Sequence, residues 1–195
     1  MMIAIRRGFS RVVAYVNRSP PIVKGDEILD GTRVWFVSDL HFGSRSKLKW
    51  ARRSHFRNLH DMHSGLIENW NRVVGWNDRV YCLGDFGDHR YREKLKGEII
   101  PTKGNNDRRN WPRQHLLTYR EKQFLALHNP RQAGPWFTGD WIIHGHTHIN
   151  SPFVDLRRRR INVCVEMINF TPISMERIWE ITEACSQYPD NRRWY

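Results

Sequence analysis

The stretch WIIHGHTHI, residues 141–149, carries the sharpest pattern in the chain. Its apolar start is typical of a buried strand, and this strand runs directly into His146 and His148. Two imidazoles separated by one residue can both approach the same metal centre. His144 precedes this pair. We expect it to point away from them as a buried core histidine.

Four other apolar runs end in the same way, each followed by polar side chains that can bind a metal ion. These runs are residues 34–37, 79–83, 98–103 and 123–127, and a further strand is expected at 161–165. The polar residues that follow the four runs are Asp39, His41, Asp85, Asn105 and His128. Ligands of α/β sheets lie beyond the carboxyl ends of the strands, so all five clusters can converge on one site. Their carboxylate, amide and imidazole donors suit Mn, Fe or Zn.

Length and composition indicate a single folded domain, since 39% of the 195 residues are hydrophobic. We expect this domain at residues 31–185, between an N-terminal extension at 1–30 and a C-terminal tail at 186–195. Regular structure is expected to begin at Arg33. Helical stretches are expected at 47–74, at 91–96 and from the N-cap Ser174 to Cys185. Their alternation with strands predicts an α/β protein.

The three cysteines fit neither a disulfide framework nor a zinc site, and no apolar run reaches the roughly 18 residues that cross a membrane. With no obvious secretory signal, we expect a cytoplasmic protein without a membrane partner. The net charge of +12 favours nucleic acid or phosphorylated partners, although an Arg-rich composition alone would give the same charge. The run Arg157–Arg160 is open to the same two interpretations, a guide for nucleic acid or a solvated turn.

The order of the clusters resembles that of the calcineurin-like metallophosphoesterases, in particular small single-domain bacterial and phage members. That family has the blocks D-x-H, G-D, G-N-H-D/E, H and G-H-x-H. Here they read Asp39-Leu40-His41, Gly84-Asp85, Gly104-Asn105-Asn106-Asp107, His128 and Gly145-His146-Thr147-His148. The resemblance spans residues 33–182. It implies a four-layer α/β/β/α sandwich, which the strand pattern alone does not distinguish from a doubly wound sheet.

The resemblance also implies two divalent metal ions, for which Mn²⁺ is expected and Fe, Zn or Ni are alternatives. The first ion would be held by Asp39, His41 and His148, the second by Asn105, His128 and His146, and Asp85 would bridge both. In such a centre a hydroxide that bridges the metals attacks phosphorus in line. The catalytic residues would be Asp85, Asn105, Asn106 and His146.

One block departs from the family pattern, because Asn106 stands where the family usually has a histidine. In the family that histidine contacts phosphate and protonates the leaving oxygen. An amide donates hydrogen bonds but delivers no proton at neutral pH, so poor leaving groups should be affected most. We therefore expect a phosphodiesterase acting on small or cyclic nucleotides. The alternatives are a nuclease or nucleic-acid end-processing enzyme and a non-catalytic metal-binding module, and the oligomeric state stays open.

Several residues near this block have a functional and a structural interpretation. Arg108, like Arg109, either contacts the substrate phosphate or caps a surface turn. His89 and His115 are either substitute acids or solvent-facing histidines. Asp107 is expected to orient a neighbouring group through hydrogen bonds.

Overall fold

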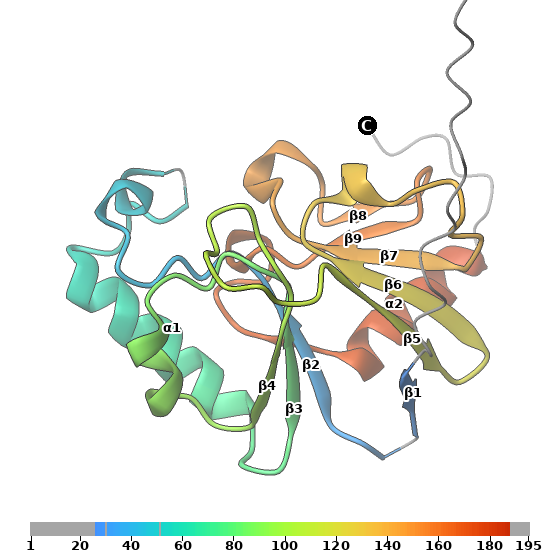
Figure 1. The fold of residues 1–195 in the computed structure, drawn as a ribbon, viewed down its shortest axis with the longest axis horizontal. Helices are drawn as coiled ribbons and strands as arrows, with labels where there is room; N and C mark the ends of the chain where they lie inside the picture. Colours follow the sequence, from blue (N-terminus) through green and yellow to red (C-terminus); the bar gives the residue numbers. More distant parts are fainter. Residues whose placement is uncertain (1–25, 30, 51, 188–195) are drawn as a thin grey trace, which may run out of the picture.

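The computed structural model describes residues 26–29, 31–50 and 52–187, which form two β-sheets and two α-helices (Figure 1). The larger sheet contains, in spatial order, β1 (Asp26–Ile28), β5 (Gln114–Tyr119), β6 (Lys122–Leu127), β7 (Trp141–His144), β9 (Arg160–Asn162) and β8 (Val154–Asp155). The smaller sheet contains β10 (Ile173–Ser174), β2 (Val34–Val37), β3 (Arg79–Cys82) and β4 (Glu98–Pro101). The α-helices are α1 (Leu59–Val73) and α2 (Met175–Ser186). Short 3₁₀ helices lie at Arg45–Lys49, His89–Lys94, Pro130–Gln132, His148–Asn150 and Val165–Met167.

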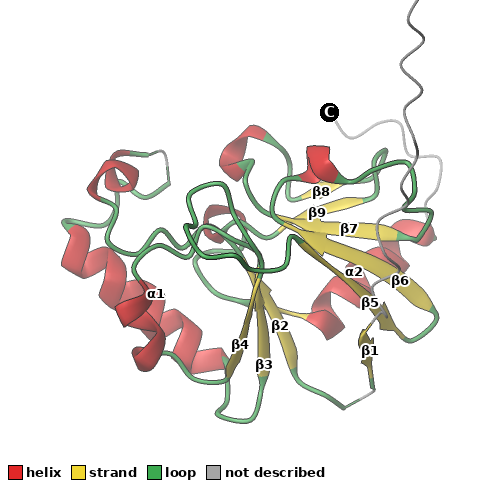
Figure 2. Cartoon of the chain, in the orientation of Figure 1, coloured by secondary structure: helices red, strands yellow, loops and turns green. Residues whose placement is uncertain are grey.

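The parallel strands of both sheets direct their carboxyl ends toward a common region. In the smaller sheet β2, β3 and β4 are parallel, with Val37, Cys82 and Pro101 in register at the three strand ends. In the larger sheet β6, β7 and β9 are parallel. The loops that follow these strands gather where the two sheets meet (Figure 2). The predicted convergence of strand ends is therefore confirmed.

The chain just beyond β2 joins the two sheets. The backbone N–H of Ser38 donates to the carbonyl of Val163 at 2.9 Å, and the N–H of Val165 donates to the carbonyl of Ser38 at 3.1 Å. Ser38 and Cys164 thus form a parallel bridge between the continuations of β2 and β9. This bridge immediately precedes Asp39, so it fixes the D-x-H block against the other sheet.

The main core lies between the two sheets, and the predicted α/β fold with two sheets packed face to face is confirmed. Phe36 and Tyr81 of the smaller sheet and Phe124 and Ile143 of the larger sheet are almost completely buried there. Such residues share one face because side chains alternate along a strand. The buried face of α2 packs against the same core.

The outer faces of the two sheets have different covers. α1 covers the smaller sheet, against which it buries Met62 and Trp70 (Figure 1). The larger sheet is covered by the loop that follows the 3₁₀ helix Pro130–Gln132, where Phe137 packs against Leu125 and its neighbours. The layers of the fold are therefore, in order, the helix α1, the smaller sheet, the larger sheet and a thin layer of loop.

The predicted helix over residues 47–74 is wrong in its first half. The chain forms a short 3₁₀ helix and then turns, and α1 begins only at Leu59. Asn58 explains this start, because its side-chain oxygen accepts the N–H of Asp61 at 2.9 Å and so caps the helix. From Leu59 onward the apolar spacing predicts the helix correctly.

Two further expectations about the elements need correction. Regular structure begins before Arg33, because β1 pairs in parallel with β5. The sequence QHLLTY of β5 has no clear alternation, and the strand pattern does not reveal it. The predicted helix at 91–96 is a 3₁₀ helix that starts at His89, and the strand predicted at 161–165 ends at Asn162.

The end of the described chain agrees better with prediction. Ser174 caps α2, since its Oγ accepts the N–H of Arg177 at 3.1 Å, as predicted. The domain boundaries themselves stay predictions, and residues 1–25 and 188–195 of the extension and the tail lie outside the described residues. In the part of the chain that the structure describes, no helix is both long and apolar enough to cross a bilayer.

Replacing Trp70 tests the contribution of α1 to the fold. Trp70 is fully buried, and its Nε1 donates to the carbonyl of Lys96 at 2.9 Å. Trp70→Ala should lower the free energy of unfolding by about 3–5 kcal/mol, because it leaves a cavity between α1 and the smaller sheet. Trp76 is 73% exposed, and the control Trp76→Ala should change this free energy by less than about 0.5 kcal/mol. Urea unfolding measures both, and equal losses would contradict this account of α1.

Candidate metal centre

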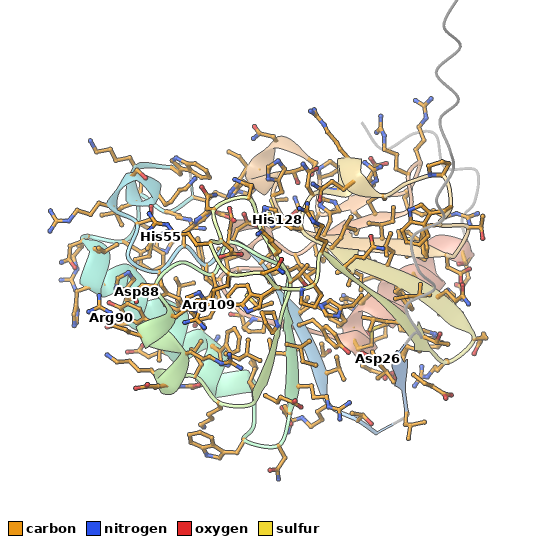
Figure 3. All side chains as sticks on the ribbon, in the orientation of Figure 1. Asp26, His55, Asp88, Arg90, Arg109 and His128 are labelled. Carbon is orange, nitrogen blue, oxygen red and sulfur yellow. The ribbon has the colours of Figure 1, made fainter. Side chains whose placement is uncertain are left out.

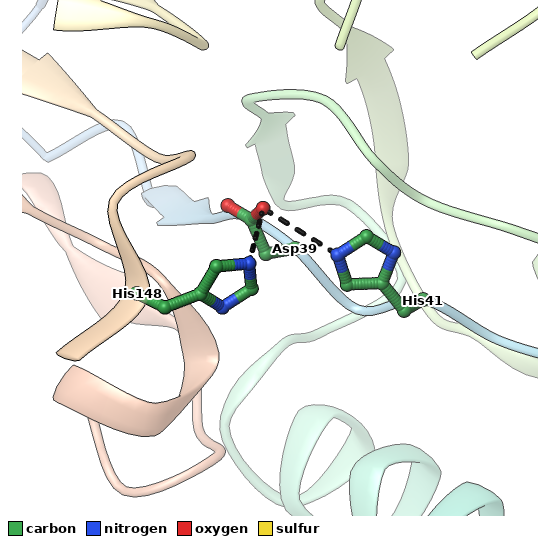
Figure 4. A group of neighbouring side chains, drawn as sticks. All are labelled: Asp39, His41 and His148. Atoms are coloured by element: carbon green, nitrogen blue, oxygen red, sulfur yellow. Dashed lines mark ion pairs between the residues drawn. The ribbon is translucent and has the colours of Figure 1, made fainter. Parts of the chain in front are cut away.

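The first group of candidate ligands contains Asp39 and His41, which follow β2, and His148, which follows β7 (Figure 4). Nε2 of His148 lies 3.3 Å from Oδ1 of Asp39, and Nε2 of His41 lies 3.6 Å from the same oxygen. The rings of His41 and His148 stack with their centroids 5.6 Å apart. All three side chains are buried, so their ligand atoms face one another in a space shielded from solvent.

The two carboxylate oxygens of Asp39 have different environments. Oδ2 accepts hydrogen bonds from the hydroxyl of Ser38 at 2.6 Å, the backbone N–H of His146 at 2.8 Å and the thiol of Cys164 at 3.2 Å. Among the described residues, Oδ1 of Asp39 and Nε2 of His41 have no hydrogen-bond partner although both are buried. An unpaired buried polar atom costs about 1–3 kcal/mol, and a cation between these two atoms would satisfy both.

The second group contains Asn105, His128 and His146, which follow β4, β6 and β7. Oδ1 of Asn105 lies 2.9 Å from Nε2 of His128 and 2.9 Å from Nδ1 of His146. These two nitrogens are 3.2 Å apart. His128 lies between the strand ends of the two sheets (Figure 3). This group is more open than the first, because Asn105 is exposed and His146 is only half-buried.

Asp85 lies between the two groups. Its Oδ2 is 3.6 Å from Nε2 of His41 and 3.8 Å from Nε2 of His128. Asp39, Asp85 and His128 also offer ligand atoms close enough together to hold one ion. The structure thus brings all seven predicted ligands to one place, while their individual roles stay predictions.

Acceptors outside the cluster orient two of the imidazoles. Nδ1 of His148 lies 3.1 Å from both carboxylate oxygens of Glu166, and Nδ1 of His128 lies 2.8 Å from the carbonyl of Leu83. When each Nδ1 carries the proton, the lone pair of each Nε2 points into the cluster. That tautomer is the one a metal ion requires at this position.

The pKa values of two candidate ligands, Asp39 and His146, are shifted downward. Burial alone would raise the pKa of Asp39, but the neighbouring imidazoles of His41 and His128 outweigh it and hold the pKa well below its usual range. Burial, with the nearby His128, lowers the pKa of His146. Deprotonated carboxylates and neutral imidazoles are the forms that bind a metal ion.

Five of the seven candidate ligands have left-handed backbone conformations. Their φ angles are 61° at Asp39, 51° at His41, 53° at Asp85, 68° at His146 and 46° at His148. Residues with side chains adopt this region rarely, at a cost of about 1–3 kcal/mol each. Backbone strain is therefore concentrated at the candidate ligands, as is common at functional sites.

Two glycines of the motif blocks are needed because other atoms approach them closely. A Cβ at Gly145 would overlap Oγ of Ser38 and come within 2.5 Å of Oδ2 of Asp39. A Cβ at Gly104 would overlap Oδ1 of Asp85. In both cases a carboxylate of the cluster rests against the backbone, so only glycine fits.

Arg53 and Glu166 support the cluster, and no sequence motif identifies either of them. The guanidinium of Arg53 is fully buried, and its Nε donates to Oε1 of Glu166 at 2.6 Å. Its two terminal nitrogens donate to the carbonyls of Asp39 at 2.6 Å and Leu40 at 3.2 Å. Burial alone would raise the pKa of Glu166, but His148 and Arg53 lower it.

The remaining residues of the third block surround Asp85. The backbone N–H of Asn106 donates to Oδ1 of Asp85 at 2.9 Å, and the amide of Asn106 donates to Oδ2. Oδ2 of Asp107 accepts the N–H groups of Asp85 at 2.9 Å and Gly104 at 2.8 Å, which confirms its predicted orienting role. Arg108 is exposed, and no contact between described residues links it to the cluster.

Three other histidines near the motif blocks lie outside the cluster. His144 is buried, as predicted, and burial lowers its pKa to about 4. Its Nδ1 lies 2.9 Å from the carbonyl of Gly145. His89 and His115 are half-buried against aromatic rings rather than fully exposed to solvent.

Known proteins resemble this chain in sequence and fold. It is 35% identical over 163 residues to the uncharacterized protein MJ1445 of Methanocaldococcus jannaschii, covering 77% of this chain and 92% of that protein. The structure of AQ665, a protein of unknown function from Aquifex aeolicus, matches with a TM-score of 0.62 at 21% identity, over 77% of this chain and 99% of that one. A novel archaeal phosphodiesterase matches with a TM-score of 0.42 at 19% identity, over 68% and 82% of the two chains. No family model matches the chain.

The motif blocks occur in the family's order, on a fold of two packed sheets, and they converge on one site. The chain belongs to the same family as MJ1445, and its motif blocks resemble those of the calcineurin-like metallophosphoesterases. All seven expected ligand positions are present, and the unpaired atoms of Asp39 and His41 face one another. The donor set therefore fits a divalent metal ion.

Replacing Arg53 tests the support of the candidate ligand cluster. Arg53→Met leaves Glu166 buried without its cation, so the free energy of unfolding should fall by about 3–5 kcal/mol. The double variant Arg53→Met with Glu166→Gln should recover part of this loss, because it removes the isolated charge.

Arg57 is the matched control, since its side chain is 85% exposed and it lies four residues away. Arg57→Met should change the free energy of unfolding by less than about 0.5 kcal/mol. Urea unfolding of the metal-free proteins measures all three variants. A stability of Arg53→Met equal to that of the wild type would show that the buried ion pair does not support the cluster.

Proposed function

We propose that this protein is a metallophosphoesterase, namely a binuclear metal-dependent phosphodiesterase that acts on small or cyclic nucleotides. The supporting observation is the convergence of seven oxygen and nitrogen ligands in two groups, with Asp85 between them. One ion would be held by Asp39, His41 and His148, and the other by Asn105, His128 and His146. Mn²⁺ is the expected ion, with Fe, Zn or Ni as alternatives, because the donors mix oxygen and imidazole nitrogen.

Divalent cations, when bound here, would neutralise phosphoryl charge and lower the pKa of a water molecule so that it can attack phosphorus. The protein's own part is to concentrate charge and fix geometry. Asp39 and Asp85 provide buried negative charge, and Glu166 orients His148. Asn105 is the exposed member of the ligand set, so phosphate would enter from its side.

The substrate class depends on Asn106. Its amide donates to Asp85, and an amide releases no proton at neutral pH. Among the described residues, no imidazole outside the proposed ligand set contacts the cluster. A leaving oxygen would therefore depart without a proton from an imidazole, which disfavours alkyl monoesters. In the family, residues other than histidine at this position accompany a preference for diesters.

Nucleic acid is the second candidate substrate. The net charge of +12 favours it, as do exposed basic residues in the segment after His41, namely Arg45, Lys49 and Arg52. Contacts between such residues and a phosphate backbone would weaken steeply with salt, whereas binding of a cyclic nucleotide would depend on salt far less. A salt titration of binding to short DNA or RNA separates the two substrates.

Metal-free protein supplied with Mn²⁺ should hydrolyse phosphodiesters from a panel of monoesters, linear diesters and cyclic nucleotides. Asp85→Asn should lower this activity by at least about 10²-fold, because it removes the charge that faces both ligand groups. It should also weaken Mn²⁺ binding measured by calorimetry. Asp88→Asn is the control, since Asp88 pairs with Arg90 outside the cluster. Undiminished hydrolysis by Asp85→Asn would rule out the proposed centre.

Restoring a histidine tests the account of the third block. Asn106→His should raise monoester hydrolysis relative to diester hydrolysis by about 10²-fold, because an imidazole can protonate the leaving oxygen. Asn110→His, at an exposed position of the same loop, is the control and should leave the ratio unchanged. If the ratio of the two rates in Asn106→His equals that of the wild type, the missing proton donor does not determine the substrate class.

A further inference from the structure

A lysine that belongs to no motif block lies beside the first ligand group. Nζ of Lys47, in the 3₁₀ helix Arg45–Lys49, lies 3.3 Å from the centroid of the Trp50 ring. The Trp50 ring meets the His148 ring nearly at a right angle, with centroids 4.4 Å apart, and lies 6.1 Å from the His41 ring. The indole is therefore a platform between the ammonium group and two of the candidate metal ligands.

The position of Lys47 differs from that of the other basic residues on this helix. Lys47 is half-buried, whereas Arg45 and Lys49 are exposed. A cation over an aromatic face is attracted by the ring and is held in place more firmly than a free surface lysine. The ring thus restricts the long side chain to the edge of the cluster.

Within residues 26–29, 31–50 and 52–187, the ammonium group of Lys47 has no anionic partner. No carboxylate of the described residues lies within ion-pair distance of it, and none of their acceptors hydrogen-bonds to it. Burial lowers the pKa of Lys47, while the negative charges of Asp85 and Asp39 partly oppose this effect. A positive charge that feels the cluster but is paired with none of its members remains available to an incoming anion.

We propose that Lys47, supported by the Trp50 ring, binds a non-bridging oxygen of the substrate phosphate at this centre. The inference rests on the proposed function, because it assumes that a phosphoryl group occupies the cluster. Asn106 provides only an amide, which donates to Asp85, and Arg108 makes no contact with the cluster. Lys47 would then supply the positive charge that the third block lacks, as a point charge toward one oxygen.

The test measures binding of inorganic phosphate to Mn²⁺-loaded protein by calorimetry, so it needs no turnover. Lys47→Met should weaken phosphate binding by at least about tenfold, the typical loss for one charge-assisted hydrogen bond. Lys47→Arg keeps the charge and should retain most of the affinity. Lys49→Met, on the same helix but exposed, should bind phosphate like the wild type. No variant should bind Mn²⁺ alone more weakly than the wild type, which excludes a loss of phosphate affinity through the metal site.

The outcomes separate this inference from the proposed function. Equal phosphate affinity of Lys47→Met and the wild type would overturn the role of Lys47, even if the protein hydrolyses diesters. A wild type that binds no phosphate when loaded with Mn²⁺ would overturn it too. If Lys47→Met weakens phosphate binding but no diester in the panel is hydrolysed, the Lys47 site stands and the proposed activity fails.

Discussion

The buried guanidinium of Arg53 links the two halves of the candidate metal centre. It donates to the carbonyl of Asp39, which follows a strand of the smaller sheet, and to Glu166, which contacts His148 from the larger sheet. A buried ion pair seldom adds net stability, because desolvation offsets most of the Coulomb attraction. Its contribution here is geometric. The backbone bridge between Ser38 and Cys164 joins the same two segments. The Arg53 side chain and this bridge therefore fix the same distance between the two sheets at the centre.

Such fixation is needed because the centre is unfavourable by itself. Five ligand residues hold left-handed backbone angles, two carboxylates lie close together, and Oδ1 of Asp39 is unpaired among the described residues. Hydrogen bonds to Oδ2 of Asp39 and from the backbone of Asp85 to Asp107 offset part of this cost. Burial of apolar side chains in the cores on both faces of the smaller sheet offsets the remaining free-energy cost. Strain concentrated at one site and offset elsewhere is typical of functional sites.

The motif residues could be predicted from the sequence because a parallel strand places whatever follows it at one known edge of the sheet. That rule needs only the apolar runs and the next few residues, so it works for Asp39, Asp85 and His128. It fails for Arg53, since the surrounding apolar spacing indicates a helix and a helical Arg is expected in solvent. The rule fails for Glu166 as well, because the neighbouring sequence does not show that this carboxylate pairs with a buried arginine. Contacts between distant, unpatterned residues depend on packing that periodicity does not encode.

An asparagine instead of a histidine at position 106 would change which leaving groups the site can accept, and it leaves the candidate metal ligands in place. All seven candidate ligands keep their supports, and Asn106 still donates to Asp85 through its backbone and its amide. Only the proton source is lost, so such a centre would stabilise charge without transferring a proton. The leaving oxygen would then depart as an anion, and the rate would follow the stability of that anion. A fixed cation such as Lys47 lowers the barrier for every substrate with a phosphoryl oxygen. Discrimination between substrates would then be left to the leaving group, so one amide would suffice to narrow the range of esters.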